Sequence, residues 1–218
     1  MANIKAGTKQ GMLFLGNATA AKPGVRFEGL TEVDEEWDGG DIKTYAADDQ
    51  ADWFAVVEDA TLTPTIKSYI GDNETLLTAT GFTSLTSAVG AAKAKTGESV
   101  PVSLAYKTTL TDKDTHDSKP EIRILYNLLI KAPEQDLTTG TNEPVEFSYE
   151  ATASSVKFVD VDGNEASTPL VVISPDDPNW AYFNTKLFGT GADATGAELV
   201  TPQDYVDYSN KPTVPAAG

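Results

Sequence analysis

Apolar and polar residues alternate at every second position in several stretches of this chain. Because neighbouring side chains of a strand point to opposite faces, this period predicts strands with one apolar and one polar face. The apolar positions that follow it are Val25 and Phe27; Val100, Val102, Leu104 and Tyr106; Ile122, Ile124, Tyr126, Leu128 and Ile130; Val145, Phe147 and Tyr149; and Val156 and Phe158. The pattern predicts an all-β fold, in which residues 122–130 form a long strand with their alternate apolar side chains on one face.

Turn-forming residues lie where these strands should end. Asp162 and Gly163 separate two apolar runs, and an Asp-Gly pair is typical of a tight hairpin or of the start of a longer loop. Pro133 should end the long strand, because proline has no N–H to donate to a neighbouring strand. The expected architecture is a β-sandwich or partial barrel with extended loops or arms.

Helix signals are few. Residues 84–95 are rich in alanine and are followed by Gly97, which predicts one short helix with a glycine stop. Thr201 precedes Pro202, and Asp204 follows two residues later, which suits the start of another helix. The fold is therefore expected to be all-β with at least one short helix.

Two segments have the composition of arms on a single domain that spans residues 1–190. The first, residues 31–59, holds eleven acidic residues and one lysine, and also Trp37, Tyr45, Trp53 and Phe54. A merely solvated loop would not carry four aromatic residues, so we predict that they contact another subunit. Packing onto the core of the same subunit is the alternative. The second arm is the Gly-, Ala- and Pro-rich segment 191–218, whose last residues should be extended.

The residues that most enzymes use are scarce. The 218-residue chain has one histidine, His116, and no cysteine. A common zinc site needs three or four Cys or His ligands, and a Ser-His or Cys-His pair needs a histidine beside its nucleophile. The neighbours of His116 are polar and loop-forming, which favours a solvated loop. We therefore predict no enzymatic activity and no disulfide.

Two acidic motifs resemble ion sites. Residues 160–165 resemble part of a calcium loop, but they lack the sixth-position glycine and the twelfth-position glutamate, so a hairpin turn is favoured. Residues 38–41, Asp-Gly-Gly-Asp, resemble a cation or phosphate loop, but their carboxylates would repel an anion, which favours a flexible turn. We expect no metal and no cofactor; the enzyme alternative is a metal-dependent hydrolase that uses only carboxylates.

The charge and the N-terminus limit the partners. The formal net charge of -17 argues against tight nucleic-acid binding, which depends on Lys and Arg. An acidic surface can still face DNA without holding it. Lys5 and Lys9 before the apolar residues 12–15 imitate a signal peptide, but the apolar run is shorter than the usual 7–15 residues. We expect no cleaved export signal and, without a run of about 18 apolar residues, no membrane span.

Three stretches together resemble the major tail proteins of bacteriophages with long, flexible tails. They are Phe-Glu-Gly-Leu at 27–30; the acidic stretch 37–49, with Tyr-Ala-Ala-Asp-Asp at its end; and the strand that begins Ile-Arg-Ile-Leu-Tyr-Asn at 122–127 and is followed by Pro133. In layout the resemblance covers residues 10–190. Residues 60–100, which are rich in Thr and Gly, depart from the spacing of that family.

The resemblance implies a fold of the tail-tube type and a structural role in the virion. Six copies would close into a ring, and rings would stack into a tube around a tape-measure protein, with tail-tip and tail-terminator proteins at its ends. DNA would pass through without specific binding. The protein would be found in the virion tail, and in the host cytoplasm during assembly. Ring closure would also pair strand edges, which otherwise promote aggregation.

A carbohydrate-binding or adhesin-type β-sandwich is the alternative binding function. It would share the aromatic content and the acidity, and Trp37 or Trp53 could serve as a platform for a sugar ring. Such a protein normally carries an export signal. Formation of rings or hollow filaments would separate the tail-tube hypothesis from this alternative.

Overall fold

The fold is described from a computed structural model of the chain. The structure describes residues 3–40, 42–47, 50–57, 60–71, 73–85, 93–95, 97–112, 114–133, 145–191 and 193–209. Of residues 3–6, 42–47 and 50–57 it describes the backbone alone. Strands predominate over helices in these residues, which confirms a mostly β fold. None of the helices among them is long and apolar enough to cross a membrane.

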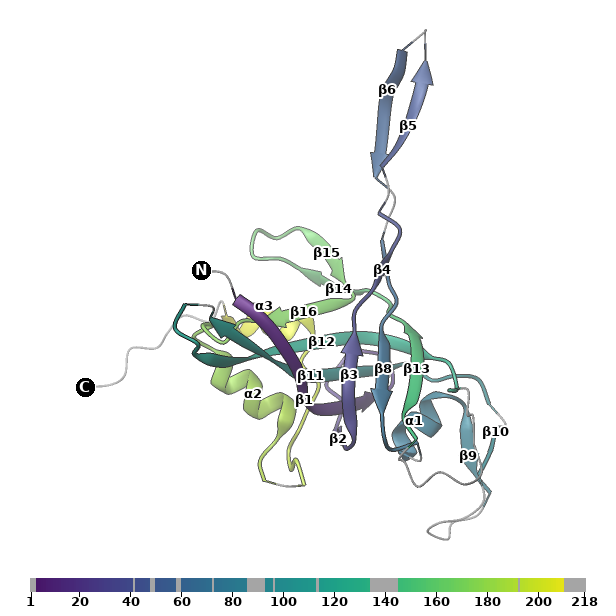
Figure 1. Cartoon of the computed structure of the whole chain (residues 1–218), viewed down its shortest axis with the longest axis vertical. Coiled ribbons are helices and arrows are strands. Elements are labelled where there is room, and N and C mark those ends of the chain that lie inside the picture. The colour runs from purple at the N-terminus through teal and green to yellow at the C-terminus, as the bar shows by residue number, and fades with distance from the viewer. Residues whose placement is uncertain are drawn as a thin grey trace, which may run out of the picture.

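One antiparallel sheet of eight strands organises the molecule (Figure 1). Seven strands follow one another in the order β2-β1-β11-β12-β13-β8-β3, and β16 pairs with β12 beside this path. In that order their bounds are Gly24–Phe27, Asn3–Leu15, Val102–Asp112, Ser118–Ile130, Phe147–Thr152, Thr65–Ser68 and Leu30–Asp34, and β16 is Leu170–Ile173. The three longest strands, β1, β11 and β12, are adjacent in this order, and each is bonded on both sides.

The sheet curls until its two ends approach each other. β3, at one end of the strand order, contacts β1, near the other end. At Gly11 of β1 an added Cβ would lie 2.8 Å from Leu30 Cδ2, so glycine permits the close approach of the two strands there. No hydrogen-bonded ladder joins β1 and β3 in the described part of the chain. Beside Gly7 and Thr8 of β1 an opening remains between these two strands, which we call the gap.

Apolar side chains are buried on both faces of this sheet. The concave face carries one core, which includes Leu13, Leu104, Leu125 and Tyr149, and helix α1 (Glu74–Ala79) contributes Leu76 to it. The core on the other face lies beneath α2 (Trp180–Phe188) and α3 (Pro202–Ser209). Its buried members include Met12, Phe14, Ile122, Ile124, Tyr126, Phe183 and Leu187. Burial of both faces explains why Val102, Leu104, Ala105 and Tyr106 are all buried rather than alternating with exposed residues.

The prediction of one apolar face along residues 122–130 was wrong beyond Tyr126. Asn127 has a positive φ of 48°, and the register with β11 shifts there, from Leu125 opposite Leu104 to Leu128 opposite Val102. An additional residue reverses the face of every side chain that follows it. Tyr126 therefore lies in the core under the helices, whereas Leu128 and Ile130 lie in the concave core.

The predicted helix at residues 84–95 was also wrong in the part that is described. Lys93–Lys95 form strand β10, which pairs with β9 (Phe82–Ser84); residues 86–92 lie outside the described residues. The nearby helix is α1, which begins after Asn73, whose side-chain oxygen accepts the backbone N–H groups of Thr75 and Leu76. This is a typical N-cap, in which one side chain satisfies two N–H groups of the first turn.

The helix start predicted at Thr201 is confirmed. The Asp204 carboxylate accepts the backbone N–H and the hydroxyl of Thr201, both at 2.9 Å, and the Thr201 hydroxyl accepts the Asp204 N–H at 3.1 Å. This reciprocal pair is a capping box. Four residues of the predicted C-terminal arm, 191–218, are instead buried in the core beside α3: Ala194, Ala197, Leu199 and Val200. Residues 210–218 lie outside the described residues.

The predicted turn at Asp162 and Gly163 is confirmed. Strands β14 (Val156–Val159) and β15 (Glu165–Thr168) form a hairpin around it. The Asp160 carboxylate accepts the N–H groups of Asp162 and Asn164 at 2.9 and 2.8 Å, and Gly163 has a φ of 84°. The carboxylate of Asp160 therefore closes this turn.

Candidate self-assembly ribbon and its anchoring cluster

A long two-stranded ribbon, residues 30–68, extends from the sheet (Figure 1). β3, β4 (Trp37–Asp38) and β5 (Ile42–Ala47) form its outgoing strand. β6 (Gln50–Val57), β7 (Thr61–Leu62) and β8 form its returning strand. The β5–β6 end projects far from the rest of the molecule. In the described chain, β5 and β6 pair only with each other.

The register of the ribbon stays constant over most of its length. Glu32 lies opposite Lys67, Trp37 opposite Leu62, Ile42 opposite Val57 and Tyr45 opposite Phe54. Each step along the outgoing strand is thus matched by one step along the returning strand. The three short pairings therefore share one register.

All four aromatic residues predicted to mediate self-assembly lie on this ribbon. Trp37 is in β4, and its side chain is 48% exposed. Tyr45 and Phe54 occupy directly opposite positions of β5 and β6, and Trp53 precedes Phe54. The surroundings of these last three side chains lie outside the described residues. The ribbon thus brings Tyr45 and Phe54 together in register and keeps Trp37 nearer the sheet.

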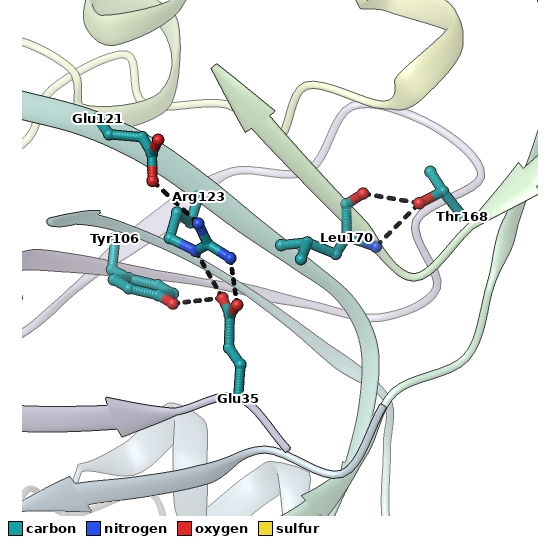
Figure 2. Close-up of polar contacts among 6 residues, drawn as sticks. All are labelled: Glu35, Tyr106, Glu121, Arg123, Thr168 and Leu170. Carbon is teal, nitrogen blue, oxygen red and sulfur yellow. Dashed lines mark hydrogen bonds and ion pairs between the residues drawn. The ribbon is translucent and has the colours of Figure 1, made fainter. Parts of the chain in front are cut away.

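Where the ribbon leaves the sheet, the side chain of Glu35 extends to strands β11 and β12 (Figure 2). Its carboxylate accepts hydrogen bonds from Arg123 Nε at 2.8 Å, from Arg123 Nη2 and from the Tyr106 hydroxyl. Arg123 Nη1 donates to Glu121 at 2.9 Å. We call Glu35, Tyr106, Glu121 and Arg123 the anchoring cluster. It joins the residue after β3 to β11 and β12.

The anchoring cluster is shielded from water. The side chains of Arg123 and Glu35 are each 12% exposed, and that of Glu121 is 9% exposed. Burial, and secondarily the bond to Glu35, raise the pKa of Tyr106 far above its ordinary value. Burial alone would lower the pKa of Arg123, but the hydrogen bond and charge of Glu35, together with the hydrogen bond to Glu121, outweigh it and raise that pKa. The guanidinium is therefore charged and bound by two carboxylates.

A polar pocket of about 290 Å³ lies beside the cluster, within the gap. Gly7 and Thr8 of β1 line one side, and Thr31 and Val33 of β3 line another, with Arg123 at its wall. In this region side chains, rather than backbone hydrogen bonds, span the distance between the ribbon and the sheet.

The other residues weighed for chemistry lie apart from this cluster. His116 is exposed in the turn between β11 and β12, where the Asp112 carboxylate accepts the N–H groups of Asp114 and Thr115. These two backbone bonds lower the pKa of Asp112. Of residues 38–41, Asp38 ends β4, Gly39 and Gly40 have positive φ angles of 88° and 81°, and residue 41 lies outside the described residues. No group of three or more acidic or histidine side chains in the described chain is arranged to hold a metal ion.

Sequence reasoning did not identify the anchoring cluster. The alternation along residues 122–130 does not connect Arg123 with Glu35, which is 88 residues away along the chain. The available signal was a charged residue between Ile122 and Ile124 in an otherwise apolar strand. A buried charge of that kind requires a partner.

No model of a known protein family matches the chain, and a search of curated proteins found no matching relative.

Proposed function

We propose that this protein is the tail-tube subunit of a long-tailed bacteriophage and that its copies polymerise as stacked hexameric rings. The observation that carries the proposal is the ribbon, whose outer strands β5 and β6 pair only with each other in the described chain. An isolated two-stranded hairpin is marginally stable in water. A second copy that packs against it would supply the missing contacts.

The exposed indole of Trp37 supports the same proposal. It is a large apolar side chain, 48% exposed, near the middle of the ribbon. Tryptophan and tyrosine are enriched among the residues that dominate protein interfaces. Trp37, Tyr45, Trp53 and Phe54 are the residues that we propose for contacts between subunits.

The margins of the sheet offer a second kind of contact. β2, β3 and β16 each pair with one strand of the sheet in the described chain. Identical subunits can pair such edges head to tail and close a ring. β16 is the least suited, because the Thr168 hydroxyl already donates to the Leu170 carbonyl at 2.6 Å and accepts its N–H at 3.2 Å (Figure 2).

The acidic charge suits a tube through which DNA passes. Lys and Arg on the wall would bind phosphates by releasing counterions, whereas carboxylates would repel them. With a net charge of -17 per subunit, a ring of copies would not retain the genome. The proposed partners are a tape-measure protein inside the tube and tail-tip and tail-terminator proteins at its ends.

Sedimentation and electron microscopy of the purified protein test the proposal. Over a concentration series, with and without a tail-tip initiator, we expect rings or long hollow filaments. A strict monomer under all of these conditions would contradict it.

A carbohydrate-binding module is the second candidate, because exposed Trp37 has the chemistry of a platform for a sugar ring. On this alternative the protein would bind glycans as a monomer, and Trp37→Ala would abolish that binding. A glycan array and sedimentation of the same preparation separate the two functions.

A further inference from the structure

The two strands of the ribbon are held differently where they leave the sheet. On the returning strand, the carbonyls of Pro64 and Leu62 accept the N–H groups of Ala151 and Ala153, at 3.0 and 2.9 Å. Backbone pairing with β13 and the residue after it therefore continues as far as β7. Leu62 is also buried in the concave core, which fixes this side of the ribbon further.

The outgoing strand lacks such backbone support: its other links are the Thr31 hydroxyl, which donates to Glu146 at 2.6 Å, and the packing of Leu30 and Val33 against the concave core. Beyond its pairing with β8, β3 borders the gap, where no ladder joins it to β1 in the described chain. By the register, Glu35 lies opposite Pro64, at the level where the ribbon leaves the sheet. Its side chain makes the connection to the main sheet that the backbone does not make.

The geometry of this connection is restrictive. Tyr106 and Arg123 are directly opposite each other on β11 and β12, so they present their donors to Glu35 from one rigid cross-strand pair. A guanidinium that binds a carboxylate through two nitrogens fixes the plane of that carboxylate as well as its position. Two strands of the sheet therefore restrain one residue of the ribbon.

An ionic connection in a buried place calls for a reason other than stability. Buried ion pairs lose hydration, and well-packed apolar residues often replace them without loss of stability. What the ionic pair adds in some proteins is a single permitted geometry. Here the geometry it would specify is the angle between the outgoing strand and the sheet.

We propose that Glu35 is a positioning residue that sets the direction of the ribbon through Arg123 and Tyr106. Without its carboxylate, the returning strand stays attached to β13 while the outgoing strand loses its hydrogen bonds to β11 and β12. The ribbon then samples a range of directions. The consequence for assembly rests on the proposed function, whereas the direction itself is a property of the single chain.

Distances between two spin labels test the direction in the full-length monomer. The chain has no cysteine, so Asp38→Cys in β4, on the outgoing strand beyond Glu35, and Lys157→Cys in β14 introduce the only two labelling sites. Without further change we expect a narrow distance distribution. Glu35→Gln should broaden it and shift its maximum. An unchanged distribution in folded Glu35→Gln protein would overturn the proposal.

Glu32→Gln is the matched control. Glu32 lies in the same outgoing strand and forms an ion pair with Lys67 at 2.7 Å, but that pair links the two strands of the ribbon to each other and is largely exposed. We expect Glu32→Gln to leave the distribution narrow. Equal broadening in both variants would show a general loosening of the ribbon and would overturn a specific role for Glu35.

Arg123→Lys decides the question if Glu35→Gln does not fold. It keeps the positive charge and removes the two-nitrogen geometry, so we expect the distribution to broaden; a narrow one would overturn the proposal. Pelleting of the unlabelled proteins tests assembly separately. Failure of the wild-type chain to polymerise would count against the proposed function alone, while the distance measurement would still decide the role of Glu35.

Discussion

At the scale of single residues, the anchoring cluster brings together several polar groups that lose hydration when they are buried. Glu35, Glu121 and Arg123 are charged groups with little exposure, and the Tyr106 hydroxyl is buried beside them. Each polar atom depends on the others, because a buried partner left unpaired loses its hydration without compensation. Substitutions here should therefore affect stability in ways that depend on pH.

Tyr106→Phe should cost about 2 kcal/mol of unfolding free energy near neutral pH, since it removes a hydrogen bond to a charged group. The folded pKa of Tyr106 is raised above its ordinary 10.0, so its contribution is fully present below pH 10 and is lost as the pH rises further. Above pH 10 the wild-type advantage should shrink by roughly 1.4 kcal/mol per pH unit. Urea denaturation of both proteins between pH 8 and 11 measures this. A difference that stays constant with pH would contradict it.

At the scale of elements, the bulge in β12 lets one strand serve two cores. Asn127 takes the left-handed conformation, and its side-chain oxygen accepts the Ala18 N–H at 2.7 Å. Because of the additional residue at this point, the side chains of Leu128 and Ile130 lie on the concave face. Asparagine suits the position because it tolerates the left-handed region better than most residues do.

Replacement of Asn127 separates the conformation from the hydrogen bond. Asn127→Gly keeps the permitted φ and loses the bond to Ala18, whereas Asn127→Ala loses the bond and also strains the backbone. We expect Asn127→Ala to be less stable than Asn127→Gly by about 1 kcal/mol, the usual cost of a left-handed residue with a Cβ. Chemical denaturation of the two variants provides the comparison. Equal stabilities would show that the backbone relaxes at this site.

The elements that could be predicted from the sequence are those with local causes. Alternation revealed the strands, Asp162 and Gly163 revealed a turn, and Thr201 with Asp204 revealed a helix start. The reversal at Asn127 could not be predicted, because its cause is the pairing of β12 with a strand whose register is set elsewhere. The anchoring cluster could not be predicted for the same reason, because Glu35 and Arg123 are brought into contact by the curl of the sheet.

At the scale of the whole molecule, the ribbon carries the proposed contacts between subunits. Replacing Trp37 and Tyr45 together with Ala should abolish polymer and leave the melting temperature of the monomer nearly unchanged, because the exposed indole contributes little to the subunit core. Sedimentation and calorimetry measure the two effects. Tyr69→Ala is the control, since Tyr69 is 54% exposed outside the projecting part of the ribbon. Equal loss of polymer and of melting temperature would indicate that Trp37 and Tyr45 support the fold of the subunit.

The constant register of the ribbon also limits the lengths that the ribbon can have. A strand rises about 3.4 Å per residue and alternates its faces with a period of two. An insertion that keeps every outer residue on its original face must therefore add two residues to each strand. Related chains that keep these faces can change the length of this hairpin only in steps of about 7 Å. A single inserted residue would move every side chain beyond it to the opposite face.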